Sequence, residues 1–243
     1  MRKPCAFRDQ SLREHTEGCL RVFEAFAEKN KDYFEVVSRR LNAALEMGGR
    51  VKPEGVEEMA GLAILFHDVG KAYNHFQRWF DDSCACRKDK VAFQYHEVAS
   101  AAMCYKFAEK HGWEREEKAL TVLSVLNHHH ASRNPFREAF TGDEYIKKKV
   151  HKIVGSGFCE GDLPELFKTC GVHLSELVLN SSDVSGFFSW LGGGLRKHSW
   201  LKLYILVMYP LIIADNLDAE QRGGIMSKSR KMFVRELKEV VGC

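Results

Sequence analysis

Residues 59–71 read MAGLAILFHDVGK. The segment from Met59 to Phe66 carries no charged side chain, so it predicts a helix that is buried on nearly every side. Pro53 is a suitable first residue for this helix, and Gly70 is expected to end it. The helix therefore delivers His67 and Asp68, two side chains of the metal-binding kind, to its C-terminal end.

Two other apolar helices are predicted to end in similar groups. The segment at about 114–127 is followed by three consecutive histidines, His128, His129 and His130, and the segment at about 198–216 has Asp215 at its end. Burying an ionised group without a partner costs roughly several kcal/mol. Three such helix ends in one chain predict that they converge on a divalent metal, for which imidazole nitrogen and carboxylate oxygen are good ligands.

The neighbouring positions of His67 and Asp68 constrain how they could share a metal. Consecutive helical residues point about 100° apart, since a turn holds about 3.6 residues. Both side chains reach one ion only near a helix end, or else Asp68 bridges two ions about 3.5–4 Å apart. A His-Asp pair alone is common by chance, and a histidine triplet also suits an exposed helix terminus. Isolated histidines are expected on the surface or in the core: His75, His111, His151, His173 and His198.

The rest of the chain is also predicted to be helical. Ser11 and Glu14 have the spacing of a capping box, which begins a helix running to about residue 29 and places His15 in its first turn. Residues 155–194 are the least readable part, with loops and short helices. Further helices are expected at about 32–47, 53–66, 76–80, 96–110, 138–154 and 226–241, the last one basic. No strand is expected, so the fold class is all-α, with a single domain over residues 1–243.

Composition narrows the class of protein. The chain has 243 residues, 45% of them hydrophobic and 28% charged, which is typical of a folded domain. A net charge of +3 permits an anionic substrate without proving one. The apolar stretch 203–214 is broken by Pro210 and is shorter than the roughly 20 residues that cross a bilayer, so it predicts a core helix and no membrane. Eight scattered cysteines without a signal segment before them predict a cytoplasmic protein with mostly reduced thiols.

At 67–71 the sequence HDVGK resembles the H-D-x-G-K signature of the HD superfamily of metal phosphohydrolases. His15 upstream and Asp215 downstream complete that superfamily's pattern. The chain is more specifically similar to the standalone HD nucleases of type I CRISPR interference. Phe76-Gln77, His96 followed by Ser100, and the histidine pair about thirty residues later carry this narrower resemblance, which covers about residues 11–216.

The resemblance implies a fold and a set of ligands. The fold would be an HD-domain helical bundle with its metal site at helix ends. One ion would be held by His15, His67, Asp68 and Asp215. A second ion would be held by His96, His128 and His129, with Asp68 shared, and Lys71 would face the scissile phosphate. The family usually has His-His-Gly where this chain has three histidines, so His129–His130 is an alternative register.

The resemblance also implies an activity. The chain would be a metal-dependent nuclease that hydrolyses single-stranded DNA, with RNA or the displaced strand of an R-loop as further substrates, through water activated by two ions. Mn²⁺ or Mg²⁺ would be the metal, with Ni²⁺, Co²⁺ or Fe²⁺ also suited. Gly70-Lys71 lacks P-loop spacing, which implies a separately encoded CRISPR helicase and an interference complex as partners. Two alternatives remain: a phosphohydrolase of nucleotides or cyclic nucleotides, and a degenerate domain that only binds, which the complete ligand set disfavours.

Overall fold

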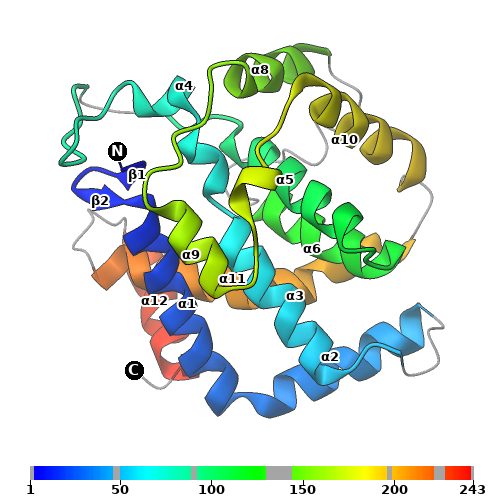
Figure 1. Cartoon of the computed structure of the whole chain (residues 1–243). Helices are drawn as coiled ribbons and strands as arrows, with labels where there is room; N and C mark the ends of the chain where they lie inside the picture. The colour runs from blue at the N-terminus through cyan, green and yellow to red at the C-terminus, as the bar shows by residue number, and fades with distance from the viewer. Residues whose placement is uncertain are drawn as a thin grey trace.

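The computed structural model (Figure 1) describes residues 3–45, 50–88, 92–129, 144–195, 199–221 and 228–241. Helices make up almost all of its regular structure, which confirms the all-α class. The prediction that no strand would form is wrong near the N-terminus. β1 (Cys5–Phe7) pairs antiparallel with β2 (Gln10–Ser11) in a short hairpin. Strands of three and two residues are too short to show an alternating pattern in the sequence.

The first half of the chain follows the predicted helices closely. The capping box at Ser11 and Glu14 is formed and begins α1. The HDVGK stretch ends in a 3-10 turn, and the short helix expected at 76–80 forms earlier, at Asn74–Gln77. In order these elements are α1 (Leu12–Lys29), α2 (Lys31–Ala44), α3 (Pro53–Phe66), η1 (Val69–Ala72), α4 (Asn74–Gln77), α5 (His96–Lys110) and α6 (Arg115–Asn127).

The second half of the chain contains helices whose positions the sequence did not predict. A capping box between Asn180 and Asp183 begins α10 within the stretch that was hardest to read. The start of the helix expected at about 138–154 lies outside the described residues. The elements are α8 (Glu144–Val154), α9 (Leu163–Thr169), η2 (Leu174–Glu176), α10 (Ser181–Gly194), η3 (Ser199–Leu203), α11 (Tyr204–Gln221) and α12 (Lys228–Val241).

Helix α11 is longer than predicted, and this changes where Asp215 lies. The sequence placed Asp215 at the helix end, but α11 continues to Gln221. Leu217 and Asp218 are both buried, so the helix continues to pack against its neighbours beyond Asp215. Asp215 and Asp218 are three residues apart and therefore lie on one face of α11.

The core is built around α11, which packs against α1, α3 and α6, while α5 packs against α6 and η1. Figure 1 shows α1, α3 and α11 side by side, with α12 beside α1 and α11. One segment, Trp200–Gln221, is long and apolar enough to cross a membrane by length and composition, and half of its window is buried within the protein. Its contacts with three helices are those of a core helix, as the sequence predicted.

A disulfide joins Cys5 of β1 to Cys84 in the loop after α4. The expectation of mostly reduced thiols therefore does not extend to this pair. The two residues are 79 positions apart, so their approach depends on the tertiary fold and has no local signal in the sequence. Among the described residues, the free thiols are Cys19, Cys86, Cys104, Cys159 and Cys170.

Candidate metal centre

Asp68 lies at the middle of the candidate site, where its two carboxylate oxygens face different imidazoles. Oδ2 is 3.2 Å from His15 Nε2 and 3.5 Å from His67 Nε2. Oδ1 is 2.8 Å from His96 Nε2 and 3.7 Å from His128 Nε2. The side chain of Asp68 is only 2% exposed. The carboxylate thus stands between two pairs of histidines, with one oxygen toward each pair.

The potential ligand atoms gather in two groups, each with all its atoms within 4.8 Å of one another. The first group is His15, Cys19, His67 and Asp215, and the second is Asp68, His96, His128 and His129. Every residue that the sequence put forward as a metal ligand is in one of them. His130, the alternative member of the histidine pair, lies outside the described residues, as does His198. His75, His111, His151 and His173 belong to neither group.

Four imidazoles face the Asp68 carboxylate and are called the innermost ones: those of His15, His67, His96 and His128. Three of the four are oriented by a carbonyl of their own backbone segment. Nδ1 of His67 lies 2.6 Å from the carbonyl oxygen of Ile64, that of His96 lies 2.5 Å from Phe93 O, and that of His128 lies 2.7 Å from Val125 O. A carbonyl only accepts hydrogen bonds, so each Nδ1 carries the hydrogen and donates it. The lone pair of each Nε2 is therefore directed at Asp68 and available to a metal.

Three polar atoms at the centre are left without hydrogen-bond partners: Asp68 Oδ1, His96 Nε2 and His128 Nε2. His96 Nε2 and Asp68 Oδ1 are 2.8 Å apart, yet both are acceptors in the tautomer that Phe93 imposes. Buried acceptors that face one another at this distance repel unless a cation lies between them. A divalent ion supplies that charge, so the residues present fit a metal.

Burial and neighbouring charges set the protonation of the first group. Burial lowers the pKa of His67 to about 4, which keeps it neutral at physiological pH. Burial alone would also lower the pKa of His15, but hydrogen bonds to Asp215, Asp218 and Asp68 raise it well above its ordinary value. Burial raises the pKa of Cys19 to about 11, so its thiol stays protonated and is a poor ligand.

The carboxylates of the centre are ionised. Burial alone would raise the pKa of Asp68, but the charge of Lys71 and the neighbouring histidines together outweigh burial and hold the pKa well below its ordinary value. The hydrogen bond from His15 likewise lowers the pKa of Asp215 against the effect of burial. Both carboxylates are thus available as ligands without a prior loss of a proton.

Lys71 places a buried positive charge beside the centre. Its Nζ donates a hydrogen bond to Asp68 Oδ2 at 2.6 Å, and it lies 4.0 Å from the ring centroid of Phe7 and 4.9 Å from that of Phe93. Lys71 and the two phenylalanines line a hollow of about 470 Å³ together with Ala92, Gln94, His96 and His129. The hollow opens directly onto the second group of ligands.

Comparisons with known proteins identify the family of the chain. Residues 9–179 match the family described as Cas3, HD domain. Over 229 residues the chain is 31% identical to the CRISPR-associated endonuclease Cas3-HD of Saccharolobus solfataricus, covering 90% of this chain and 89% of that protein. The chain belongs to the Cas3 HD-domain family. The family assignment confirms the prediction of an enzyme of the metal-dependent nuclease class.

Other members of the Cas3 HD family resemble the chain at lower identity. The CRISPR-associated endonuclease Cas3-HD of Methanocaldococcus jannaschii is 25% identical over 231 residues, covering 90% of this chain and 89% of that protein. The solved structure of a Cas3 HD domain protein from the same organism superposes with a TM-score of 0.61 at 20% identity, covering 88% of this chain and all of that one. This structural similarity confirms the predicted HD fold.

Two motif residues of this Cas3 HD domain act by holding the centre together. Ser100 lies one turn after His96 on α5, and its hydroxyl accepts a hydrogen bond from the backbone N–H of Gly70 at 2.8 Å. Gln77 donates to the carbonyl oxygens of Cys5 and Lys71, and its own amide oxygen accepts from the backbone N–H of Cys5. These contacts fix η1 between β1 and α5, which places Asp68 and Lys71.

Sequence reasoning missed Asp218, which contacts the first group. Its Oδ2 is 2.7 Å from His15 Nδ1 and accepts a hydrogen bond from Gln10 Nε2 at 3.1 Å. The available signal was its spacing of three residues from Asp215 in an apolar helix, where a second buried carboxylate needs a partner. Phe80 is 1% exposed and packs beside the disulfide, so it is not available to stack on a base.

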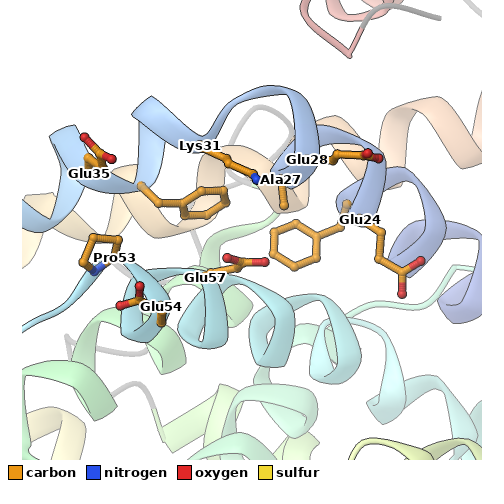
Figure 2. Close-up of a pocket in the computed structure, with 10 residues that line it drawn as sticks. Glu24, Ala27, Glu28, Lys31, Glu35, Pro53, Glu54 and Glu57 are labelled. Carbon is orange, nitrogen blue, oxygen red and sulfur yellow. The ribbon is translucent and has the colours of Figure 1, made fainter.

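A second hollow, of about 540 Å³, lies between α1, α2 and α3 and contains none of the centre's ligands. Figure 2 shows its wall of glutamates, which includes Glu24, Glu28, Glu35, Glu54 and Glu57 around Lys31. It adjoins the first residues of α3, whereas His67 follows the last, about 20 Å away at about 1.5 Å per residue. A surface this acidic repels a phosphate backbone, so it is not the candidate substrate site.

Proposed function

We propose that the chain is an endonuclease that hydrolyses phosphodiester bonds of single-stranded DNA in type I CRISPR interference, with two divalent ions at its centre. The observation that carries this proposal is the position of Asp68, whose Oδ2 faces His15 and His67 while Oδ1 faces His96 and His128. A carboxylate with one oxygen toward each of two ligand groups is suited to bridge two ions. One group would be His15, His67 and Asp215, and the other His96, His128 and His129.

The chemistry divides between the ions and the chain. Divalent ions, when bound, supply an activated water and neutralise charge on the phosphate oxygens. His67, His96 and His128 hold their Nε2 atoms in place through hydrogen bonds to the backbone. Lys71 adds a fixed positive charge at the wall of the hollow, where it can offset the negative charge that develops on the phosphate.

The hollow supports a single strand as substrate. Phe7, with 38% of its surface exposed, and Phe93 lie on its wall beside Lys71. Aromatic rings next to a positive charge suit unpaired bases, which can stack while their phosphates approach the cation. Mn²⁺ or Mg²⁺ is the proposed metal, since mixed nitrogen and oxygen ligands suit both; Ni²⁺, Co²⁺ and Fe²⁺ are further candidates.

A separate helicase is the proposed source of the strand. The sequence has no P-loop, and Gly70-Lys71 belongs to the buried η1 turn rather than to a nucleotide-binding loop. We propose that the chain acts with a separately encoded CRISPR helicase and the interference complex, as its resemblance to the standalone HD nucleases implies. Stimulation of strand cleavage by that helicase would support this partnership, and an unchanged rate would count against it.

The test is cleavage of circular single-stranded DNA, which has no ends, by the purified chain with Mn²⁺ and with EDTA. Asp68→Ala removes the carboxylate between the two groups and is expected to abolish cleavage. Asp183→Asn is the matched control, since Asp183 pairs with Lys106 on the far half of α5. Cleavage by Asp68→Ala would overturn the assignment. Hydrolysis of nucleotides alone would favour the phosphohydrolase alternative.

A further inference from the structure

His15 differs from the other three innermost histidines in what holds its Nδ1. His67, His96 and His128 each donate to a carbonyl three residues earlier on their own segment. The Nδ1 of His15 instead lies 2.7 Å from Oδ2 of Asp218, a residue of a different helix. Among these four described histidines, His15 is therefore the one whose Nδ1 is held by a side chain of another helix and not by a backbone carbonyl. His96 Nδ1 also has Glu97 Oε2 at 3.2 Å, but that carboxylate is the next residue of its own helix and adds to the bond with Phe93 O.

The position of His15 explains why α1 does not orient it. The carbonyl three residues earlier belongs to Leu12, the first residue of α1. That carbonyl already accepts a hydrogen bond from the hydroxyl of Thr16 at 2.9 Å. With its own backbone engaged in this way, His15 needs an acceptor from outside α1.

The surroundings of Asp218 are built to receive its carboxylate. Asp218 is 1% exposed and Gln10 is 4% exposed, and the Gln10 amide donates to Asp218 Oδ2 at 3.1 Å. Opposite them α1 has Gly18, one turn after His15. A Cβ at Gly18 would lie 1.7 Å from Asp218 Oδ1, so any other residue there would displace the carboxylate.

We propose that Asp218 is a positioning residue for the metal centre, acting through His15. Its carboxylate accepts the Nδ1 hydrogen of His15, which fixes the ring with Nε2 facing Asp68 and Asp215, where a bound metal would take the place of the Nε2 proton. Gln10 and Gly18 in turn place Asp218. A carboxylate behind a ligating histidine raises the basicity of the ligand and fixes its tautomer. This inference rests on the proposed metal centre.

The test measures Mn²⁺ affinity by calorimetric titration of the full chain, a readout separate from cleavage. Asp218→Asn keeps the size of the side chain but removes its charge, and is expected to weaken Mn²⁺ binding about 10–100-fold. Asp183→Asn is the control. It removes another carboxylate that caps a helix and pairs with a lysine, and it should leave the affinity unchanged.

A double-mutant cycle separates positioning from general stability. If Asp218 acts through His15, adding Asp218→Asn to His15→Ala should cause little further loss of Mn²⁺ affinity. An equal fold-loss with and without His15 would overturn the inference, and so would a wild-type affinity in Asp218→Asn. If wild type itself bound no Mn²⁺, the proposed function would fail instead.

A second variant covers the case in which Asp218→Asn does not fold. Gln10→Leu leaves both Asp218 and His15 in place and removes only the amide that holds the carboxylate. It is expected to weaken Mn²⁺ binding by a smaller factor than Asp218→Asn, with a far-ultraviolet circular dichroism spectrum like that of wild type. A folded Gln10→Leu protein with unchanged affinity would count against the proposed arrangement.

Discussion

Lys71 and Asp68 form a buried pair of opposite charges, with side chains 3% and 2% exposed. Breaking such a pair from one side leaves an uncompensated charge, which costs about 3–5 kcal/mol. In the metal-free protein, the ammonium group of Lys71 is paired directly with the Asp68 carboxylate. With metal bound, the ions would also neutralise Asp68, so the dependence on Lys71 should fall.

Lys71→Gln tests this interplay. We expect it to lower the free energy of unfolding of the metal-free protein by about 3 kcal/mol, and we expect Mn²⁺ to recover a large part of that loss. Denaturant unfolding with EDTA and with Mn²⁺ measures both values. Lys106→Gln is the matched control, because its pair with Asp183 is partly exposed and worth less than about 1 kcal/mol. An equal loss in both metal states would contradict the prediction.

At the scale of single residues, the sequence predicted much of the candidate site. His67 and Asp68 stood out because charged or polar groups ended an apolar helix, and the same reasoning reached Asp215. Asp218 was not predicted, because its role depends on its distance from His15, about 200 positions away in the chain. The Cys5–Cys84 disulfide was not predicted for the same reason, since its two cysteines are 79 positions apart.

Among the elements, η1 depends on a very close approach to α5. Gly70 lies against the backbone of α5, where an added Cβ would be 2.2 Å from the carbonyl oxygen of His96 and 2.9 Å from the backbone nitrogen of Ser100. Neither atom belongs to a flexible side chain, so the backbone itself would have to shift. A shift of η1 would move both Lys71, which lies in η1, and Asp68, which directly precedes it.

Gly70→Ala is therefore expected to lower the free energy of unfolding by about 1–3 kcal/mol, as overpacking does. Gly186→Ala, in the exposed middle of α10, meets no atom within 4 Å and should raise it by up to about 1 kcal/mol. Thermal melts of the two variants check these opposite signs. A Gly70→Ala protein as stable as wild type would show that α5 yields more easily than the contact distances indicate.

The elements themselves were predictable where local signals were strong. The Ser11–Glu14 capping box and the apolar run before His67 each located a helix, and both helices form. The β1–β2 hairpin was missed because it is held by Gln77 and by the disulfide rather than by its own sequence pattern. The end of α11 was missed because the burial of Asp218 depends on α1.

For the whole molecule, the proposed ligands come from α1, α5 and α11 and from the residues that follow α3 and α6. A metal bound here would link five helices that are separate along the chain. Since the unfolded chain cannot assemble such a site, binding adds to the stability of the folded state.

Divalent metal is therefore expected to raise the thermal midpoint. At a concentration about 100 times the dissociation constant, binding at one site adds about 2.7 kcal/mol, which for a chain of this size corresponds to about 5–10 °C. Differential scanning fluorimetry with Mn²⁺ and with EDTA measures the shift. Asp68→Ala should show a much smaller shift, and an unchanged midpoint in the wild type would contradict a metal centre.

The spread of the proposed ligands from His15 to Asp215 has a consequence for the synthesis of the protein. A chain that is still emerging from the ribosome exposes His15 and His67 long before α11 is made. It therefore lacks Asp215, and it lacks the carboxylate of Asp218 that orients His15. The nascent polypeptide cannot assemble the first ligand group until α11 has been translated, so a nuclease of this design would remain inactive toward nucleic acid close to its own ribosome.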